Sequence, residues 1–318
     1  MTSYIVRRLL QALVVLIIVS LLVFLAMHFL PGDPLLIHMA QSDMLELNEE
    51  SLNVFRHQFG LDKPLPAQYA TWVAGLLHGD FGKSLGYQDK VSTFLVERLP
   101  VTLHLGVLAF ILSVTFGILA GALAAIRRGK WLDTSMTFLA NIGITIPIFW
   151  LGILMIYYFG LKLGWLPIQG YTSPFKDFWM STRQLIMPVM CLSITSMASK
   201  ARQMRSSLLE VLNQDYVRTA WSKGLKEKDV IARHTLKNSL IPVITLAGMQ
   251  IPIIFGGSVL IETVFNIPGM GRLMVNAVFA QDFPIVLACF LLISIIVVLA
   301  NFLVDISYSW LDPRIRYG

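Results

Sequence analysis

Charge is scarce in this 318-residue chain: only 14% of its residues are Asp, Glu, Lys or Arg, and 56% are hydrophobic. A mean hydropathy of +0.69 lies far from the balance of a water-soluble globule. The composition therefore predicts an integral membrane protein. Its net charge of +6 then concerns loop topology and anionic lipid head groups rather than nucleic acid.

Cysteine is also scarce, since Cys191 and Cys289 are the only two and both lie in apolar runs. We interpret them as small buried hydrophobic residues rather than as a disulfide or a metal pair. The sequence has no H-E-x-x-H and no Cys-x-x-Cys motif, and its six histidines show no ligand spacing on one helix face. We therefore expect no catalytic, metal-binding or cofactor-binding residues in this chain.

The tripeptide Gly82-Lys83-Ser84 has the form of the end of a phosphate-binding loop. The complete motif requires a glycine at position 77, where this chain has Leu77, and no predicted strand precedes it. Any ATP that this protein uses is therefore expected on another chain.

Long apolar runs are what the chain has in abundance. Runs near the 20 residues that cross a bilayer occupy positions 9–30, 101–126, 134–160, 241–261 and 283–307. A shorter run at 185–198 completes a sixth span if its helix extends from Gln184 past Lys200, with the lysine side chain reaching the membrane interface. The first run ends without a small-x-small cleavage site, so we expect an uncleaved membrane helix rather than a signal peptide.

The distribution of positive residues predicts the orientation. A cytoplasmic N-terminus places 16 Lys and Arg inside and 9 outside, and the short loop Arg127-Arg128-Gly129-Lys130 is the strongest indicator. We therefore expect six spans with both termini in the cytoplasm. The expected divisions are the N-terminus with the first span (1–30), an extracytoplasmic segment (31–99), and a membrane core (100–318) with a cytoplasmic segment at 200–237.

In the extracytoplasmic segment, residues 48–59 can form an amphipathic helix with Leu52, Phe55 and Phe59 on one face. Pro64 and Pro66 are expected in the turns that follow. Three ionisable residues near predicted span ends are expected to lie at the membrane interface: His104, Glu262 and Asp305.

The fifth span is interrupted by small and helix-breaking residues, namely Pro242, Gly248, Pro252, Gly256 and Gly257. Small residues allow close helix packing. Broken helices also form hinges or line water-filled pathways. Both interpretations stay open at this stage.

The cytoplasmic segment DYVRTAWSKGLKEKDVIARH, from Asp215 to His234, is dense in charge. We expect residues 203–213 to extend the fourth span, Asp215 to be the N-cap of a short helix at 216–223, and Gly224 to end that helix at C′. Residues 227–236 can form a third helix. Topology and attraction to anionic lipid explain a basic loop, but a short capped helix between two spans also suits docking into a partner's groove.

This segment resembles the cytoplasmic EAA signature of binding-protein-dependent ABC importer permeases, with which Ala220, Gly224 and Leu236 agree. It is most similar to the peptide/nickel class of these permeases, and the long outer segment is similar to that of the first of two paralogous permeases. The stretches that carry the resemblance are Pro31-Gly32-Asp33-Pro34, Gly79-Asp80-Phe81-Gly82, Asp215-Tyr216-Val217-Arg218-Thr219-Ala220, Lys223-Gly224-Leu225, Arg233-His234-Thr235-Leu236-Lys237-Asn238, Pro268-Gly269-Met270-Gly271 and Asp312-Pro313-Arg314-Ile315-Arg316.

The resemblance implies an all-α, six-span protein of the type I ABC importer (MetI-like) fold in a bacterial or archaeal cytoplasmic membrane. The implied partners are a paralogous second permease, two cytosolic ATPases that bind ATP and Mg, and an extracytoplasmic substrate-binding protein, with no nucleic acid. The implied ATPase-coupling residues are Asp215, Tyr216, Arg218, Thr219, Ala220, Lys223, Gly224 and Leu225.

The expected function is therefore import of short peptides, with import of nickel or another metal chelate as the alternative in the same architecture. The alternatives of a different class are an intramembrane enzyme and an ATP-independent transporter. The enzyme is disfavoured because no nucleophile or metal constellation is recognised. The transporter is disfavoured because the spans lack the repeated carboxylates of proton-coupled pumps.

Overall fold

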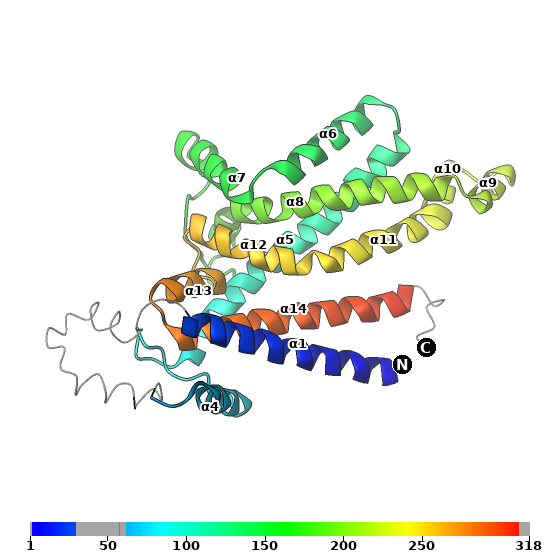
Figure 1. The fold of residues 1–318 in the computed structure, drawn as a ribbon. Coiled ribbons are helices and arrows are strands. Elements are labelled where there is room, and N and C mark those ends of the chain that lie inside the picture. Colours follow the sequence, from blue (N-terminus) through cyan, green and yellow to red (C-terminus); the bar gives the residue numbers. More distant parts are fainter. Residues whose placement is uncertain (1, 30–56, 58–61, 312–318) are drawn as a thin grey trace. The chain divides into compact units, whose positions relative to one another are not determined.

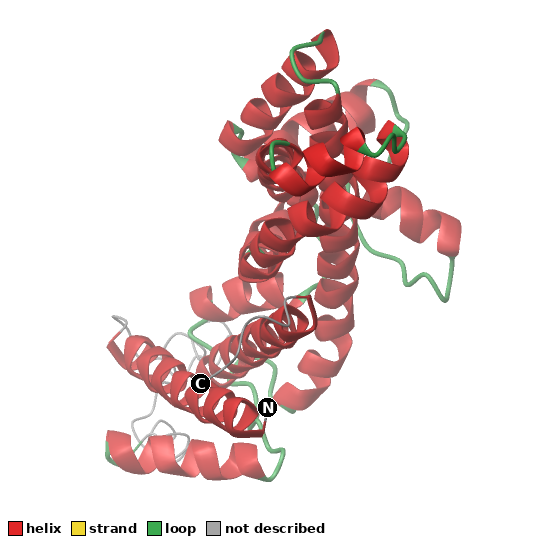
Figure 2. Ribbon diagram, turned by 90° about the vertical axis from the view of Figure 1, so that its right-hand side faces the viewer, coloured by secondary structure: helices red, strands yellow, loops and turns green. Residues whose placement is uncertain are grey.

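The computed structural model describes residues 2–29, 57 and 62–311, and within them helices form the regular secondary structure (Figures 1 and 2). The one β pairing among these residues is an isolated bridge between Lys83 and Lys90. The helix expected at 48–59 lies outside the described residues, apart from position 57. So do the stretches 31–34 and 312–316 that contribute to the family resemblance.

The chain divides into two compact units. The first unit combines Met1–Val101 with Pro268–Val298, and the second combines Thr102–Ile267 with Leu299–Gly318. Two long helices contribute to both units, α5 (Val91–Ile126) and α14 (Phe283–Leu311). The sequence-based divisions at residues 30 and 99 stay predictions.

The first unit also contains three shorter or terminal helices: α1 (Thr2–Phe29), α4 (Leu65–Leu77) and α13 (Met270–Phe279). The expectation of turns at Pro64 and Pro66 was wrong, because these prolines begin α4. Pro64 is its N-cap and Pro66 lies in its first turn, where a missing N–H leaves no hydrogen bond unmade. A buried apolar cluster joins α1, α5, α13 and α14, and includes Met27, Leu95, Met270, Val286 and Cys289.

The second unit is built around α8 (Phe178–Leu212), which packs against α6, α7, α11 and α12. Its helices, labelled in Figure 1 where there is room, are α6 (Trp131–Thr145), α7 (Ile148–Met155), the π-helical η1 (Ile156–Lys162), α9 (Asp215–Ser222), α10 (Glu227–Asp229), the π-helical η2 (Val230–Thr235), α11 (Leu236–Met249) and α12 (Ile251–Val264). The predicted extension of the fourth span is confirmed, because α8 continues without a break to Leu212.

Two of the expected spans are broken helices. The run at 134–160 divides at Pro147 into α6 and the α7–η1 segment, which are bent by 104°. The run at 241–261 divides at Gln250 into α11 and α12, bent by 44°, with Pro252 in the first turn of α12. Proline ends a helix at such points because it lacks the N–H that the next hydrogen bond requires.

Among the described residues, three helices are long and apolar enough to cross a membrane, or five if each bent pair is one span. The three are Val6–Phe29, Val91–Ile126 and Phe283–Leu303. The chain is thus an all-helical, multi-pass membrane protein, and the count of six spans stays a prediction.

Two glycines on α5 allow close approach to α8. A Cβ at Gly121 would lie 2.3 Å from the carbonyl oxygen of Ala201, and one at Gly117 would lie 2.8 Å from Cβ of Lys200. Neither position has room for a side chain. This Gly-x-x-x-Gly spacing is typical of membrane helices that pack backbone to backbone.

Candidate functional site

The short helix α9 lies between α8 and the start of the α10–η2–α11 run, at the end that these helices share (Figure 1). It begins one residue earlier than expected. Gln214 is the N-cap, with an extended backbone (φ −75°, ψ 148°), and Asp215 is the first helical residue. Asp215 was therefore wrongly assigned as the cap; its carboxylate instead stands in the first turn, where the helix dipole favours negative charge.

The end of α9 is confirmed at the predicted glycine. Gly224 has φ +77° and donates its N–H to the carbonyl of Trp221 at 2.9 Å. The N–H of Leu225 reaches the carbonyl of Ala220 at 3.4 Å. Together the two bonds form a Schellman motif, which requires a left-handed residue at C′. A Cβ at Gly224 would meet no atom within 4 Å. Glycine is therefore favoured at this position by the left-handed backbone conformation and not by a lack of space.

One face of α9 packs onto the rest of the second unit. Val217 and Ala220 are buried against Val230 of η2, with Val211 and Leu212 of α8 beside them. This apolar cluster fixes α9 against the helices that precede and follow it.

A hydrogen bond adds to that packing. Asn238 Nδ2 on α11 donates to the hydroxyl of Tyr216 at 2.9 Å. The short helix is therefore connected to both α8 and α11.

The opposite face of α9 and the turn after it are exposed, and they combine cationic and apolar side chains. Trp221 is 45% exposed and Leu225 is 41% exposed, and Thr219 and Lys223 are also exposed. Arg218 lies 3.7 Å from Asp215 in an ion pair that contributes little to stability because both partners face solvent. Trp and Arg are enriched at protein interfaces, so this face is suited to docking.

The loop between α5 and α6 lies close to this segment. A hollow of about 620 Å³ is lined by Ile126, Arg127 and Lys130 from the loop and by Glu227, Lys228 and Ile231 from α10 and η2. Three of these side chains are cationic and one is anionic. The basic loop and the basic segment thus meet at one end of the second unit.

An ion pair that sequence reasoning missed joins α6 to α8 near this end. Arg205 donates Nε–H to Oδ1 of Asp133 at 2.6 Å and Nη2–H to Oδ2 at 2.9 Å. The backbone N–H of Gly129 also donates to Oδ2 at 3.0 Å. The hydrogen bond to Asp133 raises the pKa of the Arg205 guanidinium. Since the partners are 72 residues apart, no local pattern in the sequence indicated the pair.

The five residues proposed as a hinge or pathway lie on both sides of the break at Gln250. Pro242 lies inside α11, Gly248 is buried near its end, and Pro252 is the second residue of α12. A Cβ at Gly256 would meet nothing within 4 Å, and one at Gly257 would make ordinary contacts of 3.5 Å with Leu192. Close packing therefore does not require these two glycines, and the hinge or pathway role stays a prediction.

The position expected for Lys200 was wrong. Its side chain is completely buried instead of reaching the interface. Its Nζ donates to Oε1 of Gln250 at 2.5 Å and to Oγ of Ser113 at 3.2 Å. The signal that could have found this site is polar residues within apolar runs, at Ser113 and Gln250 as well as at Lys200.

Glu262 is likewise buried, at 0% exposure, rather than interfacial. Its Oε1 accepts a 2.7 Å hydrogen bond from Thr102, which offsets part of the cost of removing a carboxyl group from water.

His104, expected at the interface, is hydrogen bonded to the hydroxyl of Tyr171 at 3.1 Å. The side chain of Asp305 lies outside the described part of the structure.

A serine motif in the first unit was not recognised from the sequence. Residues 82–86 fit the G-x-S-x-G pattern of a nucleophile elbow. In the structure Ser84 lies in the loop between α4 and α5, and its hydroxyl donates directly to the carboxylate of Asp282. The elbow requires a strand-to-helix turn and a histidine base beside the serine, so this geometry does not support a hydrolase.

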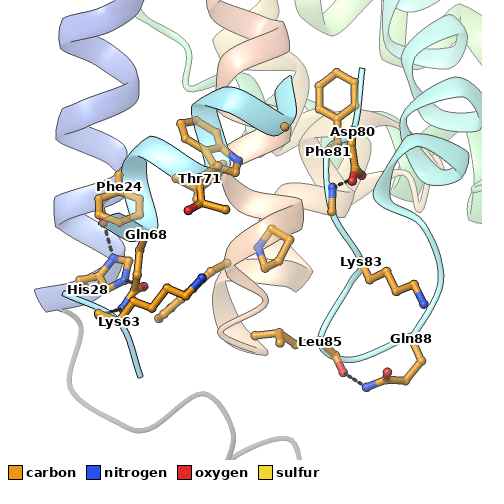
Figure 3. Close-up of a pocket in the computed structure, with 16 residues that line it drawn as sticks. Phe24, His28, Lys63, Gln68, Thr71, Asp80, Phe81, Lys83, Leu85 and Gln88 are labelled. Atoms are coloured by element: carbon orange, nitrogen blue, oxygen red, sulfur yellow. Dashed lines mark hydrogen bonds between the residues drawn. The ribbon is translucent and has the colours of Figure 1, made fainter. Parts of the chain in front are cut away.

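The same unit contains a cavity of about 510 Å³, formed by α1, α4, the loop before α5 and the start of α14 (Figure 3). Its walls include Phe24, Phe81 and Phe283, and its polar groups include Lys63 and Asp80. No predicted coupling or hinge residue lines it. Within the described residues, no cluster of three His, Cys, Asp or Glu side chains is arranged to hold a metal ion.

Comparison with known proteins identifies the family. A model described as "Binding-protein-dependent transport system inner membrane component" matches residues 117–317, and the model of its N-terminal region matches residues 1–106. A Brucella abortus (strain 2308) protein, whose name describes a peptide transport system permease, is 41% identical over 320 residues. The oligopeptide transport system permease protein AppB of Bacillus subtilis (strain 168) is 38% identical over 320 residues. Both alignments cover 100% of each chain.

A solved structure supports the fold. An inward-facing structure of the MetNI methionine ABC transporter has a chain that superposes with a TM-score of 0.55 at 18% identity. The match covers 70% of this chain and 97% of that chain. The chain thus has a MetI-like structure among its fold neighbours. Together with the family models that match 1–106 and 117–317, this shows that the chain belongs to the binding-protein-dependent transport system inner membrane components, the permease subunits of ABC importers.

Proposed function

We propose that this permease forms half of the translocation pathway of an ATP-driven importer of short peptides and that α9 couples it to cytosolic ATPases. An ABC importer permease is a transport component rather than an enzyme, and it works with ATPase and substrate-binding partners in general. The peptide substrate is supported by the names of relatives that match over their whole length at 38–41% identity.

One observation carries the coupling role. A helix of eight residues, α9, is fixed by Val217 and Ala220 on one face and leaves Arg218 and Trp221 exposed on the other. A flexible loop would bend when a partner displaces it. Because α9 is fixed between α8 and α11, a displacement of α9 moves both helices.

The proposed orientation has six spans and both termini in the cytoplasm. It is supported by the meeting of Arg127, Lys130 and Lys228 around one hollow, because cytoplasmic loops near helix ends carry an excess of Lys and Arg. In this orientation α9 faces the compartment that contains ATP. The membrane is the cytoplasmic membrane of a bacterium or archaeon.

The proposed mechanism follows from this placement. ATP-driven closure of two ATPase subunits moves the groove that holds α9, with Tyr216, Thr219 and Lys223 to Leu225 at the contact. The helix transfers the displacement to α8 and α11, and the pathway alternates between inward-facing and outward-facing states. This is a two-state element biased by a ligand on another chain. Pro242, Gly248, Pro252, Gly256 and Gly257 are the residues proposed to hinge or line the pathway.

The proposed assembly is a heterodimer with a paralogous permease, two ATPases that carry ATP and Mg, and an extracytoplasmic substrate-binding protein. Import of nickel or another metal chelate is the alternative within the same assembly. No further cofactor and no nucleic acid is assigned to this chain.

Co-purification and transport test this proposal together. The chain is expressed with the paralogous permease, the ATPases and the binding protein of the proposed assembly, purified through a tag on this chain, and reconstituted in proteoliposomes. We expect the partners to co-purify and labelled di- to pentapeptides to accumulate only with ATP. ATP-dependent uptake of a nickel chelate but not of peptides would favour the alternative. Uptake without ATP, or substrate turnover by this chain alone, would contradict the proposal.

A further inference from the structure

Lys200 places a basic side chain in the interior of the second unit. Its side chain is 0% exposed, and its three ammonium donors are directed to neutral oxygens: Oε1 of Gln250 at 2.5 Å, Oγ of Ser113 at 3.2 Å and the carbonyl of Ser196 at 3.5 Å. The ring of Phe110 lies 5.8 Å from Nζ. Among the described residues no carboxylate pairs with it. A buried ionisable side chain in a membrane protein is costly, and its presence therefore indicates a role.

The shortest of these contacts is made at the break between two helices. Gln250 follows the last residue of α11 and precedes the first residue of α12. Its N–H still donates to Leu246 at 3.1 Å, and its carbonyl already accepts from Ile254 at 3.1 Å. The backbone hydrogen bonds are therefore kept on both sides of a 44° bend, and Lys200 binds the residue at which the direction changes.

The helices between α9 and this contact are packed together along their length. Next to α9, Val217 and Ala220 pack on Val230. Farther along, Met204 and Leu208 of α8 share a buried cluster with Val243 of α11.

We name residues 200–249 the α8–α11 hairpin. From Lys200 to Leu212 the helix rises by twelve residue steps, about 18 Å at 1.5 Å per residue. The Lys200–Gln250 contact closes this hairpin at the end opposite α9.

We propose that Lys200 is a positioning residue that makes the α8–α11 hairpin move as one body, so that a displacement of α9 is delivered at the Gln250 break and reorients α12. This rests on the proposed function, in which ATPases displace α9. Without the Lys200 contact α8 and α11 separate at their far end, and the displacement is lost in bending. The hinge is then the Gln250–Ile251 junction, which leaves Gly256 and Gly257 with the pathway-lining part of the proposed role.

Four variants isolate this contact. Lys200→Met keeps an unbranched side chain of similar length but removes all three donors. Lys200→Met with Gln250→Leu also removes the acceptor, so that the amide of Gln250 is not left unsatisfied in the interior. Gln250→Glu keeps an acceptor opposite the ammonium and is the conservative variant. Lys162→Met is the matched control, since Lys162 is outside the hairpin and lies over the rings of Tyr157 and Tyr158.

The experiment measures peptide uptake and ATP hydrolysis by the complete transporter in proteoliposomes, with the yield of folded complex as a control. We expect the double variant to assemble, to hydrolyse ATP at no less than half the normal rate, and to import at least tenfold less peptide per ATP. Gln250→Glu and Lys162→Met should keep a ratio within about twofold of the unmodified protein.

Three results would overturn the proposal. The first is a normal uptake-to-ATP ratio in the assembled double variant. The second is loss of assembly in both Lys200→Met and the double variant while Gln250→Glu assembles normally, which would make the contact purely structural. The third is a Lys200 variant with a normal uptake-to-ATP ratio whose KM changes for peptides with a free carboxyl terminus but not for peptides with an amidated one. This result would make Lys200 a substrate-binding residue. Failure of ATPases to co-purify with the unmodified chain would instead contradict the proposed function.

Discussion

Arg205 on α8 and Asp133 at the start of α6 form a bidentate ion pair, with contacts of 2.6 and 2.9 Å. The carboxylate side chain is 8% exposed and the guanidinium side chain 32%, so the pair is largely shielded from solvent. It fixes the first turn of α6 to α8, ten residues before α9 begins at Asp215. The basic α5–α6 loop is held in place by the same carboxylate, which accepts the N–H of Gly129 at 3.0 Å.

Removal of this carboxylate should destabilise the protein. Asp133→Ala leaves a partly buried guanidinium without its partner, and a charge-assisted hydrogen bond contributes about 1.5–3 kcal/mol. We expect the thermal unfolding midpoint of the detergent-solubilised protein to fall by several degrees. Asp215→Ala is the control, because the Asp215–Arg218 pair is exposed on both sides and should leave the midpoint nearly unchanged. Equal midpoints for the two variants would contradict the structural role of the Asp133–Arg205 pair.

The second prediction is that Gly224 is required for its left-handed backbone conformation and not for its small size. Its φ of +77° costs a residue with a β-carbon about 1–2 kcal/mol, and the cost is highest for β-branched side chains. Because an added Cβ meets no atom within 4 Å, Gly224→Val and Gly224→Asn both have room. Asn tolerates left-handed backbone and Val does not.

We therefore expect Gly224→Val to lower peptide uptake per ATP hydrolysed severalfold, with Gly224→Asn close to the unmodified protein. The measurement is coupled uptake and hydrolysis at matched protein level. If Gly224→Val transports normally, the end of α9 is not needed for coupling.

Replacement of Gly121 by a larger residue should impair folding. A methyl group there would lie 2.3 Å from the carbonyl oxygen of Ala201 and 2.7 Å from Cβ of Met204, so α5 and α8 must move apart. Overpacking of this kind costs about 1–3 kcal/mol. We expect Gly121→Ala to reduce the yield of monodisperse protein and its thermal stability. Gly256→Ala, which adds a methyl group to open space, should fold as well as the parent. Similar yields and stabilities for both variants would show that α5 and α8 do not pack as described.

Structural features that depend on residues close together in the chain could be predicted from the sequence. Gly224 predicted the end of α9 because few residues other than glycine adopt a left-handed C′ position, and the apolar run at 283–307 predicted α14 because its length and composition suit a bilayer. Asp215 was misassigned as the cap because Asp also favours the first turn of a helix, where it in fact lies. The interruption of the fifth span was expected from its prolines and glycines, and α11 and α12 do meet at a break there. The break at Pro147 was not expected, because a hydropathy window does not register a missing N–H.

The contacts between distant residues could not be predicted in this way. Lys200 and Gln250 are 50 positions apart, and Lys200 and Ser113 are 87 positions apart. The polar residues within the apolar runs indicate that a buried site exists, but not which of them are partners. Only the packing of α8 against α5 and α11 shows that they meet in the interior. The assignment of α9 as a coupling helix came from the resemblance of its sequence, and the structure adds which of its faces is exposed.

The central claim, that the exposed face of α9 contacts an ATPase, is tested most directly by site-specific photo-crosslinking. A photoreactive phenylalanine analogue replaces Trp221 in the assembled transporter, and a second preparation carries it at Trp179, an exposed tryptophan in the first turn of α8. The account predicts an ATP-sensitive covalent adduct between position 221 and an ATPase subunit, and none from position 179. A transport-competent complex in which position 221 forms adducts only with lipid or with the permeases would contradict it.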